Sequence, residues 1–198
     1  MKLAYPSSYL KFQAASLSVM LGYLSDRLYD EVRGPGLTYG VRMGISPTSG
    51  RLTLTLDRSS RLAEAYRTTR QLLTRFSTGG DAWDKTLLDS AKGSQIFSKT
   101  LRENTVEDLV NQAFKSYLRG TDATYNREFV KALVGVQLED MKALSHGLLS
   151  TFLSPETSQI VVVCSPNTVK EIVTDFQNMG FQMKTYTHLD ETFLNEDI

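Results

Sequence analysis

The chain has 198 residues, of which 41% are hydrophobic, and its 22 Lys and Arg residues balance 22 Asp and Glu residues. This length suits one ordinary domain, and the zero net charge gives no general attraction to nucleic acid or to an anionic membrane surface. No apolar stretch approaches the roughly 20 residues that span a bilayer, and the N-terminal residues lack a signal-peptide core and an arginine-rich transit pattern. We therefore predict a single domain over residues 1–198, without nucleic-acid or membrane partners.

The first predicted element is a long helix that ends at a glycine-proline-glycine sequence. Its apolar residues recur at a spacing of three or four, at positions 10, 14, 17, 21, 24 and 28, which places them on one helix face. Ser7 and Ser8 precede the helix, and Gly34-Pro35-Gly36 ends it near Arg33.

A hairpin of two strands is predicted next. Hydrophobic residues alternate with polar or small ones over residues 38–45 and again over residues 52–56. Between them, Pro47-Thr48-Ser49-Gly50 has the composition of a turn.

The middle of the chain is predicted to be helical. Apolar spacing indicates helices from residue 59 to Gly79-Gly80, then over residues 81–100, 105–120, 123–133 and 138–152. Thr105 and Asp108 are typical of a capping box, and the apolar residues that follow form one continuous seam on that helix.

The end of the chain is predicted to contain two strands that flank a helix. The apolar run over residues 159–164 indicates a buried strand, and it contains the single cysteine, Cys164, which we expect to be a buried small hydrophobe in a reducing compartment. A helix over residues 168–179, stopped by Gly180, precedes a strand over residues 181–186. We expect residues 189–198 to form a flexible tail. This element order predicts an α+β fold with one mostly antiparallel sheet covered by helices.

The sequence lacks the patterns of a metal site or of an activated nucleophile. His146 and His188 are far apart, there is one cysteine, and no serine lies in a Gly-x-Ser-x-Gly elbow. We expect His146 on a helix surface, and neither metal nor cofactor in this chain. Gly34-Pro35-Gly36 is also a poor phosphate loop, because phosphate loops lead from a strand into a helix N-terminus, whereas this one leaves a helix C-terminus.

The segment from Arg33 to Gly40 fits the recognition of an extended peptide. Its glycines allow another backbone to approach, and the rim of a strand offers amides and carbonyls. Arg33 and Tyr39 supply hydrogen-bond donors that could also hold the negative charge on a peptide carbonyl under attack. In the structural alternative, that of a generic α+β interaction domain, Arg33 neutralises the helix dipole and Tyr39 caps the core.

The run from Leu28 to Val41, LYDEVRGPGLTYGV, resembles a signature of the insulinase family of zinc metallopeptidases. That signature reads helix, R-G-x-G-L-x-Y-G, strand, and belongs to a non-zinc domain of the C-terminal half. Residues 136–144, 149–152 and 160–164 are similar to the late helix and closing strand of the same domain. The resemblance covers nearly the whole chain, loosely between residues 80 and 135. The spacing of Arg33 and Tyr39 is similar to that in the presequence-protease branch or a related eukaryotic subclass.

In that family an N-terminal lobe holds zinc on an inverted His-x-x-Glu-His helix, and a C-terminal lobe closes over it. The resemblance implies supporting catalytic roles for Arg33 and Tyr39, which reach across to the peptide. The implied substrate-binding residues are Arg33, Gly34, Gly36, Leu37, Tyr39 and Gly40. Zinc is then expected in the N-terminal lobe, on the same polypeptide or a separate subunit, so that this chain alone is inactive.

Two departures from the family pattern are visible in the sequence. The zinc motif is absent, and of the strand that opens the family's domain only Leu3-Ala4-Tyr5 could remain. We therefore predict the substrate-clamping C-terminal domain of a peptide-degrading zinc metallopeptidase, with a sheet that lacks its first strand. We expect it in the cytoplasm or, alternatively, in the mitochondrial matrix. The competing hypothesis is a catalytically inactive scaffold or partner subunit of the same fold, similar to a processing-peptidase subunit or a respiratory core subunit.

Overall fold

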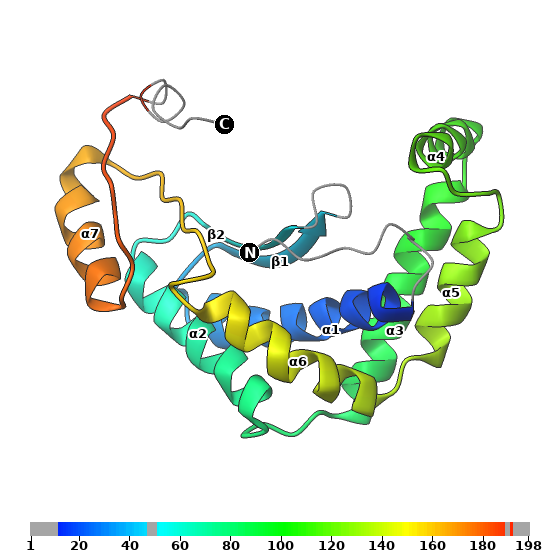
Figure 1. Ribbon diagram of the computed structural model, residues 1–198, viewed down its shortest axis with the longest axis horizontal. Coiled ribbons are helices and arrows are strands. Elements are labelled where there is room, and N and C mark those ends of the chain that lie inside the picture. Colours follow the sequence, from blue (N-terminus) through cyan, green and yellow to red (C-terminus); the bar gives the residue numbers. More distant parts are fainter. Residues whose placement is uncertain (1–11, 47–50, 189–190, 192–198) are drawn as a thin grey trace. The chain divides into compact units, whose positions relative to one another are not determined.

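The computed structural model describes residues 12–46, 51–188 and 191 (Figure 1). In chain order its elements are α1 (Phe12–Leu28), η1 (Tyr29–Arg33), β1 (Gly40–Ser46), β2 (Arg51–Asp57), α2 (Leu62–Thr78), α3 (Lys85–Thr100), η2 (Leu101–Glu103), α4 (Val106–Arg119), α5 (Tyr125–Gly135), α6 (Leu138–Leu153), η3 (Pro166–Thr168) and α7 (Val169–Asn178). The protein is therefore α+β, as the element order predicted, with helices and a two-stranded antiparallel sheet in the described residues. None of the described helices is long and apolar enough to cross a membrane.

The chain divides into two compact units, Met1–Ser158 and Gln159–Ile198. Their placement relative to each other is not determined, and the single domain stays a prediction. The expected helix start at Ser7 and Ser8 and the turn over residues 47–50 lie outside the described residues, as does the expected tail apart from Glu191.

Helix α1 is the buried centre of the first unit. Ala15, Val19, Met20 and Leu24 are all 0% exposed, and they lie around the helix rather than along one stripe. The helix contacts α3, α5, α6 and β1, and Figure 1 shows it between the hairpin and α6. The sequence correctly predicted this helix, but it indicated a single buried face where the structure buries nearly the whole circumference.

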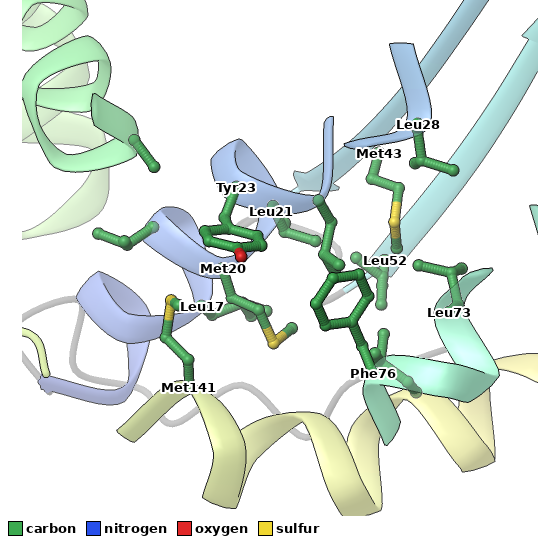
Figure 2. Close-up of a cluster of buried hydrophobic side chains, with 14 of the residues drawn as sticks. Leu17, Met20, Leu21, Tyr23, Leu28, Met43, Leu52, Leu73, Phe76 and Met141 are labelled. Atoms are coloured by element: carbon green, nitrogen blue, oxygen red, sulfur yellow. The ribbon is translucent and has the colours of Figure 1, made fainter. Parts of the chain in front are cut away.

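Side chains from the hairpin, α2 and α6 meet those of α1 in one hydrophobic cluster (Figure 2). The hairpin contributes Met43 and Leu52, α2 contributes Leu73 and Phe76, and α6 contributes Met141. Each large apolar side chain that is removed from water in this way contributes about 1.5–3 kcal/mol to folding. The cluster joins the hairpin to the helices and so fixes the end of α1 next to the start of β1.

Three aromatic rings close one side of this core. Tyr23 lies 5.8 Å from Phe76 and 4.9 Å from Trp83 between ring centroids, and the Phe76 and Trp83 rings are 4.7 Å apart. The buried Tyr23 hydroxyl accepts a hydrogen bond from the main-chain N–H of Asp84 at 3.0 Å. Tyr23 therefore packs as an apolar residue while its one polar atom is satisfied.

The hairpin forms from two strands, as the alternating sequence predicted. Gly40 pairs with Asp57 at one end, and Ile45 pairs with Leu52 near the other. Within the described residues the sheet contains β1 and β2 alone, so each strand has one edge without a ladder partner there. Such an edge offers N–H and C=O groups to another extended chain.

Helix α4 forms as predicted, but its apolar seam is exposed. The Asp108 N–H donates to the Thr105 hydroxyl oxygen at 3.1 Å, which confirms the predicted cap. Phe114 is 60% exposed, Val106 79% and Tyr117 82%. Periodicity therefore predicted a helix correctly, but it could not show whether the apolar face has a partner within the chain.

The second unit contains α7, whose Phe176 packs edge-on against Phe181 at 6.1 Å between ring centroids. The two strands predicted over residues 159–164 and 181–186 are wrong, because both segments are irregular and without ladder pairing. Cys164 is exposed rather than buried, and Val161 and Val163 are 82% and 92% exposed. An apolar run becomes a buried strand only where partners satisfy its main chain, and the described residues supply none.

Helix α1 continues into a π-turn, η1, which leads into the segment from Arg33 to Gly40. The N–H of Gly34 donates to the carbonyl of Tyr29 at 2.8 Å, and the N–H of Leu37 donates to that of Val32 at 3.2 Å. A Cβ atom on Gly34 would lie 2.5 Å from the main-chain oxygen of Asp30, far inside van der Waals contact. This turn therefore requires glycine at position 34, and it ends the helix at Arg33 as predicted.

Ion pairs attach the π-turn to helix α2. The Glu31 carboxylate accepts from Arg27 at 3.0 Å and from Arg75 at 2.5 Å, and Arg75 also donates to Asp81 at 3.0 Å. Hydrogen bonds with Glu31 and then Asp81 raise the pKa of the Arg75 guanidinium above its ordinary value, so it stays charged at physiological pH. These ion pairs attach the π-turn to α1 through Arg27 and to α2 through Arg75.

Replacing Glu31 with Gln should lower the free energy of unfolding by about 1 kcal/mol, because the partly buried carboxylate joins two arginines rather than one. Urea denaturation should show that the loss shrinks in high salt and is less than additive with Arg75→Gln. Glu64→Gln removes an exposed pair with Arg61 and is the matched control, with an expected loss of about 0.3 kcal/mol. Equal losses for the two glutamates would contradict the network.

Replacing Gly34 with Ala should destabilise the protein by about 1–3 kcal/mol, because the turn must shift to relieve the contact with the Asp30 oxygen. Gly93 in α3 is the control, since its added Cβ would meet nothing within 4 Å. Gly93→Ala should stabilise the protein by about 0.5–1 kcal/mol. The opposite signs are measured by urea denaturation, and a stable Gly34→Ala variant would disprove the steric requirement.

Candidate functional site

The structure brings Arg33 and Tyr39 together at the surface. The guanidinium carbon of Arg33 lies 5.4 Å from the centroid of the Tyr39 ring and 4.6 Å from that of Tyr29. Both separations are in the range of a cation–π interaction. Tyr39 is 63% exposed and Tyr29 51% exposed, so a ligand can reach both rings. Tyr29 was not among the predicted site residues. Its spacing of four residues from Arg33 would have predicted that the two side chains lie on the same helix face.

Hydrogen bonds fix the segment before β1 against the end of β2. The buried Thr38 hydroxyl donates to the main-chain oxygen of Asp57 at 2.7 Å, and the Tyr39 N–H donates to the same oxygen at 3.1 Å. The Ser59 hydroxyl donates to the main-chain oxygen of Leu37 at 2.6 Å. Tyr39 is therefore presented from a fixed backbone rather than from a free loop.

Arg58 is a second cation at this site that the sequence analysis missed. Its guanidinium carbon lies 5.1 Å from the centroid of the Tyr39 ring. It follows β2, far from Arg33 and Tyr39 in sequence, and no local pattern links it to them. The hairpin pairing of Gly40 with Asp57 brings it near, and that register was the one signal that could have located it.

Contacts or backbone conformation within the chain itself explain why glycine occupies positions 34, 36 and 40. A Cβ atom on Gly34 would clash with the main-chain oxygen of Asp30, as described above. A Cβ atom on Gly40 would lie 2.9 Å from the Asp57 carboxylate. That carboxylate pairs with Arg42 at 2.9 Å. Gly36 has a φ of +78° and open space around its missing Cβ. Of these positions, Gly36 is the one with room on its Cβ side for another chain.

Leu37 differs from the other predicted substrate-binding residues because its side chain lies in the core. It is 5% exposed and belongs to the cluster around α1. Its side chain is thus unavailable to a ligand, and it anchors the loop from below. The reason is visible in the fold: a segment that reverses direction beside a buried helix needs one apolar side chain to hold it there.

Arg33 and Arg58 have no carboxylate partner among the described residues. Two acidic groups close to them in sequence pair with other cations, Glu31 with Arg27 and Arg75, and Asp57 with Arg42. Arg33 also lies in the last turn of its helix, where a cation favourably meets the dipole. This structural role leaves its N–H donors unused, so both roles are compatible.

The site can donate hydrogen bonds but contains no group placed for metal binding or nucleophilic attack. In residues 12–46, 51–188 and 191, no three His, Cys, Asp or Glu side chains are grouped to hold a metal. His146 lies exposed on α6, as expected, with Nδ1 3.1 Å from the main-chain oxygen of Ser77. Guanidinium and phenol groups suit peptide carbonyl and carboxylate oxygens.

Comparisons with known proteins give one informative match and no family assignment. No family model and no solved structure matches the chain. The "Uncharacterized protein C05D11.1" of Caenorhabditis elegans is 28% identical over 114 residues, which are 58% of this chain and 11% of that protein. The matched segment is thus a small part of a much longer relative, whose name states no activity.

Proposed function

We propose that this chain is the substrate-clamping C-terminal domain of an insulinase-family zinc metallopeptidase that degrades peptides. The observation that supports it most is the pairing of Arg33 with the exposed Tyr39. The guanidinium carbon lies 5.4 Å from the ring centroid and has no carboxylate partner in the described residues. These are the two residues to which the family resemblance assigns supporting catalytic roles. Zinc belongs in this proposal to an N-terminal lobe outside the chain.

The proposed binding mode uses the start of β1. An extended peptide lies along the rim of β1 beside Tyr39 and Gly40, where main-chain groups that do not bond to β2 provide register and affinity. Arg33 and Tyr39 donate hydrogen bonds to one peptide carbonyl. Zinc in the other lobe would supply an activated water, and Arg33 and Tyr39 would hold the negative charge that develops on the carbonyl. Closure of the lobes excludes water and strengthens these interactions.

An incomplete insulinase-like sheet is consistent with the strand edges of this chain. Both strands of the hairpin have an edge without a partner in the described residues, and Val161 and Val163 of the apolar segment at residues 160–164 are exposed. In the proposed complete enzyme, further strands satisfy these groups, including the first strand of the family's domain. The length of the nematode relative is compatible with a polypeptide that carries further domains.

The alternative function is an inactive scaffold or partner subunit of the same fold. It is favoured by one observation, the absence of a His-x-x-Glu-His sequence from the chain. The two functions differ in the zinc content of the native protein. A purified native assembly that cleaves peptides and contains one zinc per copy of this chain supports the peptidase, whereas a stable assembly that lacks zinc and activity supports the scaffold.

In the native peptidase, Arg33→Ala and Tyr39→Phe should each lower kcat by about 100- to 1,000-fold with a smaller change in KM, because each removes a donor that acts on the developing charge. Initial rates on a quenched fluorescent peptide give both constants. Zinc content and melting temperature, measured on the same samples, show that the variants remain folded and loaded.

Arg61→Ala is the matched control for this experiment. It removes a surface guanidinium that follows the same strand, but Arg61 is already paired with Glu64 at 3.2 Å and contacts neither tyrosine ring. Its kcat/KM should equal that of the wild type. If Arg33→Ala and Tyr39→Phe behaved like this control, the catalytic-support role would be wrong.

A further inference from the structure

We infer that Arg58 is a specificity-determining residue, which makes the site select a carboxylate on the bound peptide. This inference rests on the proposed peptide-binding function and adds the substrate class to it. Its basis is the placement of a second guanidinium beside Tyr39, from a part of the chain outside the segment Arg33–Gly40.

The backbone of Arg58 is held in an unusual conformation. Its φ is +51°, and no other non-glycine residue of the described chain has a positive φ. L-residues other than Asn and Asp seldom adopt this left-handed region, because the Cβ atom crowds the backbone. A strained residue persists only where its surroundings determine it, and such residues gather at functional sites.

Hydrogen bonds of the two neighbouring residues hold Arg58 in this conformation. Asp57, before it, accepts hydrogen bonds from Thr38 and Tyr39 through its main-chain oxygen. Ser59, after it, donates to Leu37. Arg58 is therefore fixed on both sides to the segment that carries Tyr39. The consequence of the left-handed backbone is a guanidinium 5.1 Å from the ring centroid.

The charges around Tyr39 call for an anion. Arg33 and Arg58 both lie within cation–π range of its ring, and neither has a carboxylate partner among the described residues. Each guanidinium brings a full positive charge to the Tyr39 ring, and a negative group bound beside that ring would interact favourably with both. A peptide carbonyl supplies only a dipole, whereas a carboxylate supplies a full charge and two oxygens for the planar donors of arginine.

The carboxylate can come from a Glu or Asp side chain or from the C-terminus of the peptide. The experiment separates these sources with fluorescein-labelled peptides of one extended sequence. One pair differs by Glu against Gln at an internal position scanned along the peptide, and another differs by a free against an amidated C-terminus. Fluorescence anisotropy with the full chain gives the Kd of each peptide.

The wild-type chain should bind one carboxylate peptide about tenfold tighter than its neutral counterpart, which is the effect expected of one charge-assisted hydrogen bond. Arg58→Gly should abolish this ratio, so that the carboxylate peptide and its neutral counterpart bind with equal Kd. Arg58→Lys should retain part of the ratio, because charge remains without the planar donors. Arg61→Ala, whose guanidinium is paired with Glu64, should keep the full ratio.

Loss of fold does not explain a positive result, since glycine is favoured at a φ of +51° and Arg58→Gly should melt no lower than the wild type. Arg33→Ala should weaken both members of each pair, because it acts on binding as a whole. A Glu:Gln ratio that survives Arg58→Gly overturns the role of Arg58 and leaves peptide binding standing. A chain that binds neither member of any pair overturns the inference and the proposed function together.

Discussion

The burial of α1 is the constraint on which the candidate site depends. The helix is surrounded by other elements, so it must end and reverse direction without exposing its last apolar side chains. Leu28 and Val32 are 0% exposed, and Leu37 returns to the same core after the π-turn. Between these anchors the turn requires glycine at position 34 and leaves Arg33 facing Tyr29 and Tyr39. Packing therefore fixes the position of a polar site.

The distribution of charge links this local geometry to binding. Within η1, Glu31 is directed to Arg27 and Arg75, where it stabilises the fold. Two residues later, Arg33 has no acidic partner in the described chain. Arg58, which lies beside Tyr39, has none there either. Of the acidic residues nearby in sequence, Glu31 and Asp57 pair with other cations. Unpaired donors on a fixed backbone are the arrangement that recognition of a peptide carbonyl or carboxylate requires.

Local sequence signals predicted the elements of the first unit well. Periodicity, the Thr105 cap and the Gly79 end located its helices, and strict alternation located the hairpin. What they missed depends on contacts between distant residues. Large apolar side chains of α4 are exposed, as are Val161 and Val163, and a hydrophobic pattern alone does not show which segment, if any, covers it. Arg58 lies beside Tyr39 because of the strand register, which brings together residues that are distant in sequence. The pair of Arg33 and Tyr39 was predictable because one short segment contains both.

The most direct test of the account is to map where an extended peptide contacts the folded chain. Uniformly labelled protein is titrated with an unstructured peptide, and NMR follows the backbone amides together with the arginine side-chain Nε–H signals. The account predicts that shifts concentrate at Arg33, Tyr39 and Gly40 and saturate together. Shifts confined to the exposed apolar face of α4, with Arg33 and Tyr39 unchanged, would contradict it and show that the chain binds partners through a different surface.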